Sequence, residues 1–237
     1  MNNQKLNLKM TARIAGVLYL INAITAAFGI IIIPAKLILP DNVAATVQNI
    51  ISNEFLFRCS ILSSFVSQIV FVFLALTLYK LFEKVSTFHV RTLLTLVVIS
   101  IPIAFFIIFN QISALSILKE NFMTSFEQVQ QYSLAMSKLK MYENGIVVIG
   151  IFWGLWLIPF GQLVYKSDFI PKVFGILLIA GGISYLIDVI TFILIPEFHV
   201  QTNILVAITS SIAELSMVLW FLIKGIKKDK KTLITNI

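Results

Sequence analysis

The sequence predicts an all-α integral membrane protein, a bundle of six transmembrane helices with two amphipathic helices at the outer interface. Of the 237 residues 59% are hydrophobic and only 12% are charged, and the mean hydropathy is +0.96. A soluble domain carries about 25% charged residues. The apolar residues come in continuous blocks of about 20, the length that a helix needs to cross roughly 30 Å of hydrocarbon. A membrane barrel would instead show short stretches of alternating polarity, so the spans are predicted to be helical.

The apolar blocks predict six spans within a single membrane domain of residues 1–237. The first block follows Lys5, Lys9 and Arg13, a pattern that also opens a signal peptide. Its apolar run reaches Ile33 and exceeds the 7–15 residues of a signal-peptide core, so a retained span is favoured. The spans are expected at about 13–33, 56–82, 92–118, 143–165, 173–195 and 203–224, followed by a basic cytoplasmic tail at 225–237.

The distribution of basic residues predicts the orientation. With the N-terminus in the cytoplasm, 13 of the 18 Lys and Arg residues fall on the inner side. Cytoplasmic segments of membrane proteins retain positive charge. The protein is therefore expected to have both termini inside. The five basic residues on the outer side are Lys36, Arg58, Lys119, Lys138 and Lys140.

Two outer connections show helical spacing of apolar residues. The first lies behind Pro40 and Asp41, which is the expected N-cap. Both segments predict amphipathic helices at the outer interface, where covering the ends of spans is favoured over a lid on a substrate site. Their apolar positions are Val43, Val47, Ile50 and Ile51 in the first and Phe122, Phe126, Val129, Tyr132, Met136 and Leu139 in the second.

A few polar residues inside the spans are the candidate functional site. An ionisable group at the centre of a membrane helix costs about 2.5–3.5 kcal/mol on insertion scales, so each one is a candidate by default. Asp188, Glu214 and Arg58 are expected in the outer half of the membrane or near its midplane. We expect them to form one coupled cluster, because pairing of opposite charges offsets the cost of removing them from water. The predicted intramembrane polar cluster is Arg58, Asp188, Glu214, Asn110, Gln111 and Asn22.

The faces of the helices support this convergence. Small and polar residues recur at helical spacing on several spans, and such residues permit close approach of helices. Gly181 and Gly182 are expected to act in this way. For Asn22, Asn110 and Gln111 we expect hydrogen bonds between helices. The polar positions are Tyr19, Asn22 and Gly29 on the first span, Ser60, Ser63, Ser64, Ser67 and Gln68 on the second, Gly181, Ser184, Tyr185, Asp188 and Thr191 on the fifth, and Ala207, Ser210, Ser211 and Glu214 on the sixth.

Patterns typical of catalysis, metal binding and nucleic-acid binding are missing from the sequence. Cys59 is the single cysteine, and His89 and His199 are placed in connecting loops. No H-E-x-x-H motif, Gly-rich phosphate loop or Ser and His pair within a span is present. Catalytic residues, metal ligands and cofactors are therefore not expected. The expected partners are the lipid bilayer and anionic lipid headgroups, the latter through the C-terminal lysines Lys224, Lys227, Lys228, Lys230 and Lys231.

The chain contains the runs Thr11-Ala12-Arg13-Ile14-Ala15-Gly16-Val17-Leu18-Tyr19-Leu20, Ala44-Ala45-Thr46, Leu56-Phe57-Arg58, Leu163-Val164-Tyr165-Lys166-Ser167, Gly181-Gly182-Ile183-Ser184-Tyr185-Leu186-Ile187-Asp188 and Ala213-Glu214-Leu215-Ser216. Together these runs resemble a family of bacterial multi-span membrane proteins known only as a domain of unknown function, number 4386. The resemblance covers about Thr11 to Gly225 and implies a six-span protein of the bacterial inner membrane without an assigned activity. It matches Arg58, Asp188 and Glu214 to recurrent polar positions of the family. Ser64 stands where many members have Asp, and Trp156 stands where some have His.

Three classes of function remain open at this point. A non-catalytic membrane protein, in which the polar cluster holds helices together, is favoured. A small-solute or proton-linked transporter using Asp188 and Glu214 is the alternative, because carboxyl groups within spans serve proton relays in carriers. An intramembrane enzyme is the third and would need a nucleophile or a metal ligand that the sequence lacks.

Overall fold

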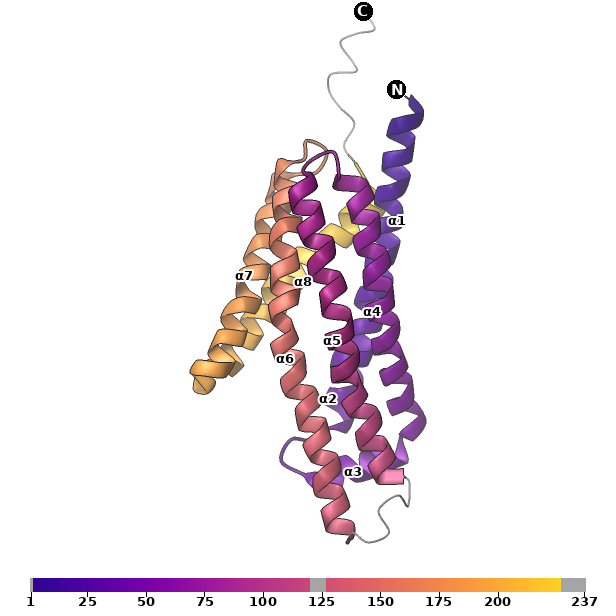
Figure 1. Ribbon diagram of the computed structural model, residues 1–237, viewed down its shortest axis with the longest axis vertical. Coiled ribbons are helices and arrows are strands. Elements are labelled where there is room, and N and C mark those ends of the chain that lie inside the picture. The colour runs from indigo at the N-terminus through magenta and orange to yellow at the C-terminus, as the bar shows by residue number, and fades with distance from the viewer. Residues whose placement is uncertain (1, 120–126, 227–237) are drawn as a thin grey trace, which may run out of the picture. The chain divides into compact units, whose positions relative to one another are not determined.

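The computed structural model describes residues 2–119 and 127–226, which fold into helices joined by short turns (Figure 1). Six helical segments in this part of the chain are long and apolar enough to cross a membrane, which confirms the predicted all-α membrane bundle. In chain order the elements are α1 (Asn2–Ala26), a π-helical turn (Ala27–Ile32), α2 (Ile33–Leu37), α3 (Val43–Ser52), α4 (Glu54–Phe82), α5 (Thr87–Lys119), α6 (Gln128–Lys166), α7 (Lys172–Leu194), a 3₁₀ turn (Pro196–Phe198) and α8 (His199–Ile223).

The first span continues beyond its predicted end at Ile33. It passes through the π-helical turn and ends at Leu37. Pro34 has no backbone N–H to donate, and the N–H of Ile33 bonds to the carbonyl of Phe28 five residues back. The widened turn lets the helix continue past the proline.

The second predicted amphipathic segment is not a separate helix, which corrects that expectation. Phe122 and Phe126 lie outside the described residues, but Val129, Tyr132 and Leu139 belong to α6, which runs unbroken into the fourth span. Neither Gly nor Pro occurs between Gln128 and Asn144, so nothing in the sequence stops the helix there. The resulting helix has 39 residues. At 1.5 Å per residue it is about 58 Å long, roughly twice the hydrocarbon thickness.

The chain forms two compact units that share its long helices. The first unit comprises Met1–Leu20, Phe71–Val98 and Gly150–Ile237, and the second comprises Ile21–Val70 and Ile99–Ile149. Helices α1, α4, α5 and α6 contribute residues to both. The single-domain organisation expected from the sequence stays a prediction.

Aromatic side chains form the centre of the first unit. Phe160 lies with its ring centroid 5.4 Å from that of Trp156, 6.0 Å from that of Phe82 and 6.4 Å from that of Phe221. Tyr19 packs on the same group, with its ring centroid 6.1 Å from Trp156. These contacts tie α1, α4, α6 and α8 together within the unit. Trp156 is buried and belongs to this core.

Paired glycines set the distance between α6 and α7 in the first unit. A Cβ added to Gly182 would lie 2.7 Å from the carbonyl oxygen of Gly154, and one added to Gly154 would lie 2.6 Å from the carbonyl oxygen of Gly182. Gly161 and Gly175 repeat this reciprocal contact at 2.5 and 2.6 Å. The two glycines of each helix are seven residues apart and therefore lie on one face. Along these faces the backbones of α6 and α7 are in direct contact. The predicted close-packing role of Gly182 is confirmed.

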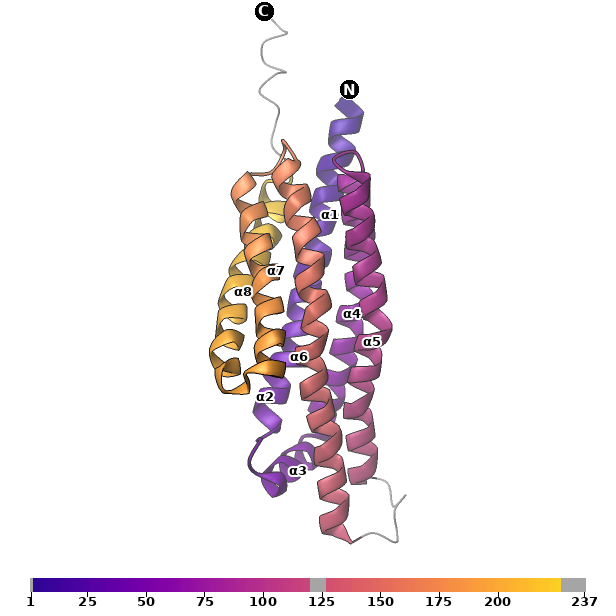
Figure 2. The ribbon, with the colours of Figure 1, turned by 60° about the vertical axis from the view of Figure 1, so that its left-hand side comes forward.

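Helices α7 and α8 form an antiparallel hairpin, which Figure 2 shows side by side. The turn between them contains Pro196–Phe198, and the hydroxyl groups of Ser184 and Thr209 meet across the hairpin at 2.7 Å. At the opposite end of α8, Gly225 lies against the beginning of α1. A Cβ on Gly225 would be 3.4 Å from Cγ of Lys9. The beginning of α1 and the end of α8 therefore lie at the same end of the first unit.

Apolar side chains from α2, α3, α4, α5 and α6 fill the second unit. Helix α3 begins after Asn42, whose side chain accepts a 2.9 Å hydrogen bond from the N–H of Ala45, so Asn42 and not Asp41 is the N-cap. Thr46 binds both the N–H and the carbonyl of Leu39, at 2.8 and 3.0 Å. This fixes α3 to the segment before it. The core consists of Ile33, Leu37, Ile50, Phe57, Ile61, Ile108, Leu115 and Leu139, with smaller neighbours.

The polar face predicted for the second span is confirmed. Ser60, Ser64, Ser67 and Gln68 on α4 are all buried. The hydroxyl of Ser63 donates a 2.9 Å hydrogen bond to the carbonyl of Thr25 on α1. Gly29 packs against Ser64 and the carbonyl of Ser60, which leaves no room for a Cβ. On α8 the predicted face is only partly right, because Ala207 and Ser211 are exposed and Val206, Ser210 and Ala213 are buried.

Candidate functional site

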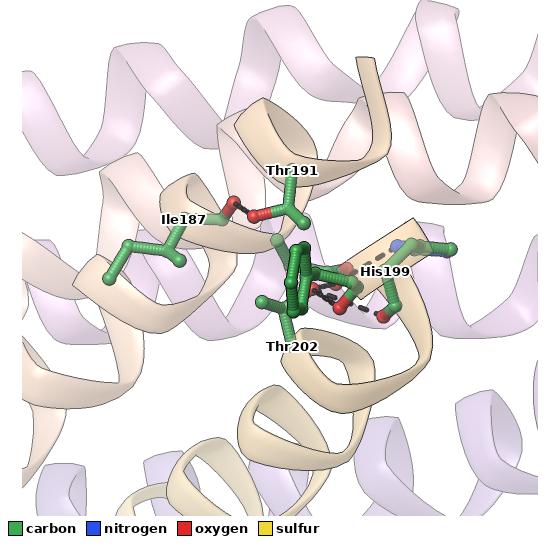
Figure 3. Close-up of polar contacts among 6 residues, drawn as sticks. Ile187, Thr191, His199 and Thr202 are labelled. Atoms are coloured by element: carbon green, nitrogen blue, oxygen red, sulfur yellow. Dashed lines mark hydrogen bonds and ion pairs between the residues drawn. The ribbon is translucent and has the colours of Figure 1, made fainter. Parts of the chain in front are cut away.

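Asp188 is a buried carboxylate near the end of α7, with 4% of its surface exposed. Its Oδ1 accepts a 2.6 Å hydrogen bond from the hydroxyl of Thr202, and Nδ1 of His199 lies 3.1 Å from the same oxygen. Figure 3 shows Thr202 and His199 converging from the first turn of α8, with Thr191 bonded back to the carbonyl of Ile187 on α7. The acid thus joins the two helices of the hairpin.

The short turn between α7 and α8 explains this contact. Only Ile195 and the 3₁₀ turn Pro196–Phe198 separate the two helices, so the first turn of α8 packs back on the last turns of α7. The His199 ring rests on that of Phe192, with centroids 4.9 Å apart. The expectation that His89 and His199 lie in connecting loops is wrong, because His89 is the third residue of α5 and His199 is the first residue of α8.

Glu214 lies deeper along α8 and is partly buried. Its Oε2 accepts a 2.7 Å hydrogen bond from the hydroxyl of Tyr19 on α1. Tyr19 is itself buried against Trp156 and Phe160. The carboxyl group is therefore held at the edge of the aromatic core of the first unit.

Tyr185 on α7 links the surroundings of the two acids. It lies near enough to Glu214 and Asp188 to interact electrostatically with both carboxyl groups. Asp188, Tyr185, Glu214 and Tyr19 therefore form a row of titratable side chains within the first unit. We call these four residues the acid row.

Arg58 pairs with an acid on its own helix in the second unit. Its Nε and Nη2 each lie 2.8 Å from Oε1 of Glu54, one turn earlier on α4. The other oxygen of Glu54 lies 2.7 Å from Nζ of Lys119 at the end of α5. Glu54 is not among the residues predicted for the site. The spacing of four residues between Glu54 and Arg58 is the signal that was available.

In the part of the chain that it describes, the structure shows no bond between helices for the amide side chains of Asn110 and Gln111. Nδ2 of Asn110 donates to the carbonyls of Phe106 and Ile107 within α5, which corrects the expected bond between helices. Gln111 is fully buried, and both polar atoms of its side chain lack a hydrogen-bond partner among the described residues. Asn22 is partly buried, and its backbone carbonyl accepts a bond from Thr25. A single cluster of all six predicted residues stays a prediction.

Residues 2–119 and 127–226 contain no group of three or more His, Cys, Asp or Glu side chains placed to hold a metal ion. Asp188 and His199 form a pair and lack a third ligand of this kind. The carboxyl and phenol groups of the acid row, and the imidazole of His199 beside it, can form hydrogen bonds and exchange protons.

The family model described as Domain of unknown function (DUF4386) matches residues 14–225 of the chain. The chain belongs to the DUF4386 family. The match confirms the resemblance drawn from the sequence. It begins within the first membrane helix, covers the other five, and includes the acid row and Arg58. Comparison with curated proteins and with solved structures gives no match.

Proposed function

We propose that this DUF4386 protein is a non-catalytic, multi-pass protein of the bacterial inner membrane, whose acidic side chains within the spans hold helices together. It acts through contacts with lipids or other proteins. Both termini face the cytoplasm. The lysines of the tail add contacts to anionic headgroups of the inner leaflet.

The pairing of the two acids is the observation that carries this proposal. Glu214 on α8 receives a hydrogen bond from Tyr19 on α1, and Asp188 on α7 receives one from Thr202 on α8. Each acid thus has a donor on another helix. A buried polar group costs little when it is bonded and several kcal/mol when its partner is removed, so such pairs hold helices in register.

The distribution of charge supports the orientation. An even number of spans places both ends of the chain on the same side of the membrane. The contact between Gly225, after α8, and Lys9, near the beginning of α1, agrees with this arrangement. Placing these ends in the cytoplasm leaves 13 of the 18 basic residues inside. The family resemblance supports the bacterial inner membrane.

A proton-linked carrier is the second candidate, and the acid row favours it. Asp188 lies near the turn between α7 and α8, Glu214 lies deeper, and Tyr185 interacts with both. Rows of titratable groups in a membrane protein transmit protons when water reaches them.

Proteoliposomes carrying a pH-sensitive dye separate the two candidates. A potassium diffusion potential is applied to wild-type protein, to Glu214→Gln and to the matched control Glu83→Gln, which changes an exposed residue. The non-catalytic proposal expects the proton flux of empty liposomes for all three proteins, together with a loss of thermal stability in Glu214→Gln alone. Flux that disappears only in Glu214→Gln, with unchanged stability, establishes the carrier instead.

A further inference from the structure

We propose that the second unit binds one anionic phospholipid in a groove between the beginning of α4 and the end of α5. The groove has a volume of about 310 Å³. Arg58 and Lys119 line it at one end, Ser116 adds one hydroxyl group, and the other lining side chains are apolar. This inference requires only that the spans cross a membrane and does not depend on the non-catalytic role proposed above.

Glu54 places the two cations beside each other at the mouth of the groove. Its Oε1 pairs with Arg58 and its Oε2 with Lys119, at 2.8 and 2.7 Å. Two cations against one carboxylate leave one positive charge, which matches the single negative charge of a phosphodiester. The Arg58 and Lys119 side chains remain 58% and 42% exposed. Both therefore keep N–H donors free for phosphate oxygens, because a guanidinium has five and an ammonium has three.

Below the cations the groove is apolar and open to the side. Ile61, Leu62 and Phe65 of α4 and Ile112 of α5 line it, and Leu62 is 64% exposed. Phe65 also packs edge-on against Phe105, with ring centroids 4.9 Å apart, so the wall on which an acyl chain would lie is fixed in place. A groove that is cationic at one end and apolar along its length has the polarity of a lipid. A free phosphate would leave the apolar part without a ligand.

The depth of the site along α4 agrees with a lipid headgroup. Arg58 and Lys80 are the basic residues near the two ends of α4. They are 22 positions apart, which at 1.5 Å per residue is about 33 Å, close to the thickness of the hydrocarbon core. Arg58 therefore lies at the level of the lipid phosphates when Lys80 lies at the opposite surface.

Native mass spectrometry of the purified full chain tests the site by counting bound lipids. The protein is titrated with phosphatidylglycerol, which is anionic, or with phosphatidylcholine, which is zwitterionic. We expect tight binding of one phosphatidylglycerol molecule and an apparent affinity about tenfold weaker or more in the double variant Arg58→Gln, Lys119→Gln. The control Lys138→Gln, Lys140→Gln removes the same charge from α6 and should change the affinity less than about twofold.

A second variant fills the groove and keeps its charges. Leu62→Trp places a larger ring in the exposed apolar part and should weaken phosphatidylglycerol binding by a similar factor, with an unchanged melting temperature of the lipid-free protein. Inorganic phosphate in millimolar excess should leave the lipid bound. Equal binding of the two lipids, unchanged binding in both variants, or full displacement by inorganic phosphate would overturn the proposal.

Discussion

Tyr19 and Glu214 are joined by a 2.7 Å hydrogen bond, although they lie 195 positions apart in the chain. The bond connects α1, the first membrane helix, to α8, the last. Tyr19 is buried in the aromatic core of the first unit, so its hydroxyl is held in a fixed direction. Close packing of the same two helices accompanies the bond, since a Cβ on Gly16 would lie 2.9 Å from Cβ of Phe221.

The glycine contacts between α6 and α7 predict opposite effects for two adjacent substitutions. Gly182→Ala places a methyl group 2.7 Å from the carbonyl oxygen of Gly154, so the helices must separate, and it should cost about 1–3 kcal/mol. In Gly181→Ala the added methyl group would lie 3.4 Å from its nearest neighbour, Cα of Ser210, which is an ordinary contact distance. This substitution should be neutral or should stabilise the protein by up to about 1 kcal/mol, because Ala favours a helix more than Gly does. Denaturation of both variants in detergent checks this. Equal effects of the two substitutions would contradict the glycine contact.

Because Thr202 bonds to Asp188 on another helix, replacing it should destabilise the protein more than replacing a threonine that bonds only within its own helix. Thr202→Val keeps the shape and removes the 2.6 Å bond, which leaves the acid with the His199 contact alone. We expect a loss of about 1–3 kcal/mol. Thr77→Val is the matched control, because Thr77 donates to the carbonyl of Phe73 in the same helix. Thermal unfolding of the two variants should differ, and a smaller loss for Thr202→Val than for Thr77→Val would count against the pairing.

The orientation predicts which loops a membrane-impermeant maleimide can reach in intact cells. In a Cys59→Ser background, Asp41→Cys lies before α3 on the predicted outer side, and Glu83→Cys lies between α4 and α5 on the inner side. Labelling of Asp41→Cys in intact cells, and of Glu83→Cys only after permeabilisation, is expected because the basic residues favour the inner side. The reverse pattern at both positions would show that the chain is inserted the other way round.

The six-helix fold could be predicted from the sequence, because the length and the polarity of a membrane span are properties of a continuous stretch of residues. Each predicted apolar block coincides with one long helical segment of the structure, although the fifth and sixth helices end one residue earlier than predicted, at Leu194 and Ile223. Ser60 and Ser64 are buried as their spacing indicates. The extent of α6 was missed because amphipathic and fully apolar stretches join without a breaker. A change of polarity alone does not end a helix.

The partners of the polar residues were harder to predict, because they depend on the register between helices. Asp188 was recognised as a candidate, but its bond to Thr202 follows from the way the short turn places α8 against α7. The sequence predicts that Arg58 pairs with Asp188 or Glu214, whereas its partner in the structure is Glu54, one turn away on the same helix. A local pair of opposite charges needs no tertiary contact and was the simpler partner for Arg58.

A double-mutant cycle on Tyr19 and Glu214 tests most directly whether the acid holds the helices together. Tyr19→Phe, Glu214→Gln and their combination are compared by unfolding in detergent, with Tyr165→Phe, which removes an exposed hydroxyl, as the control. The account predicts that each single change at the pair is destabilising, that the double variant is milder than the sum, and that the coupling energy is about 1 kcal/mol. Additive losses, or a Tyr19→Phe variant as stable as Tyr165→Phe, would contradict it.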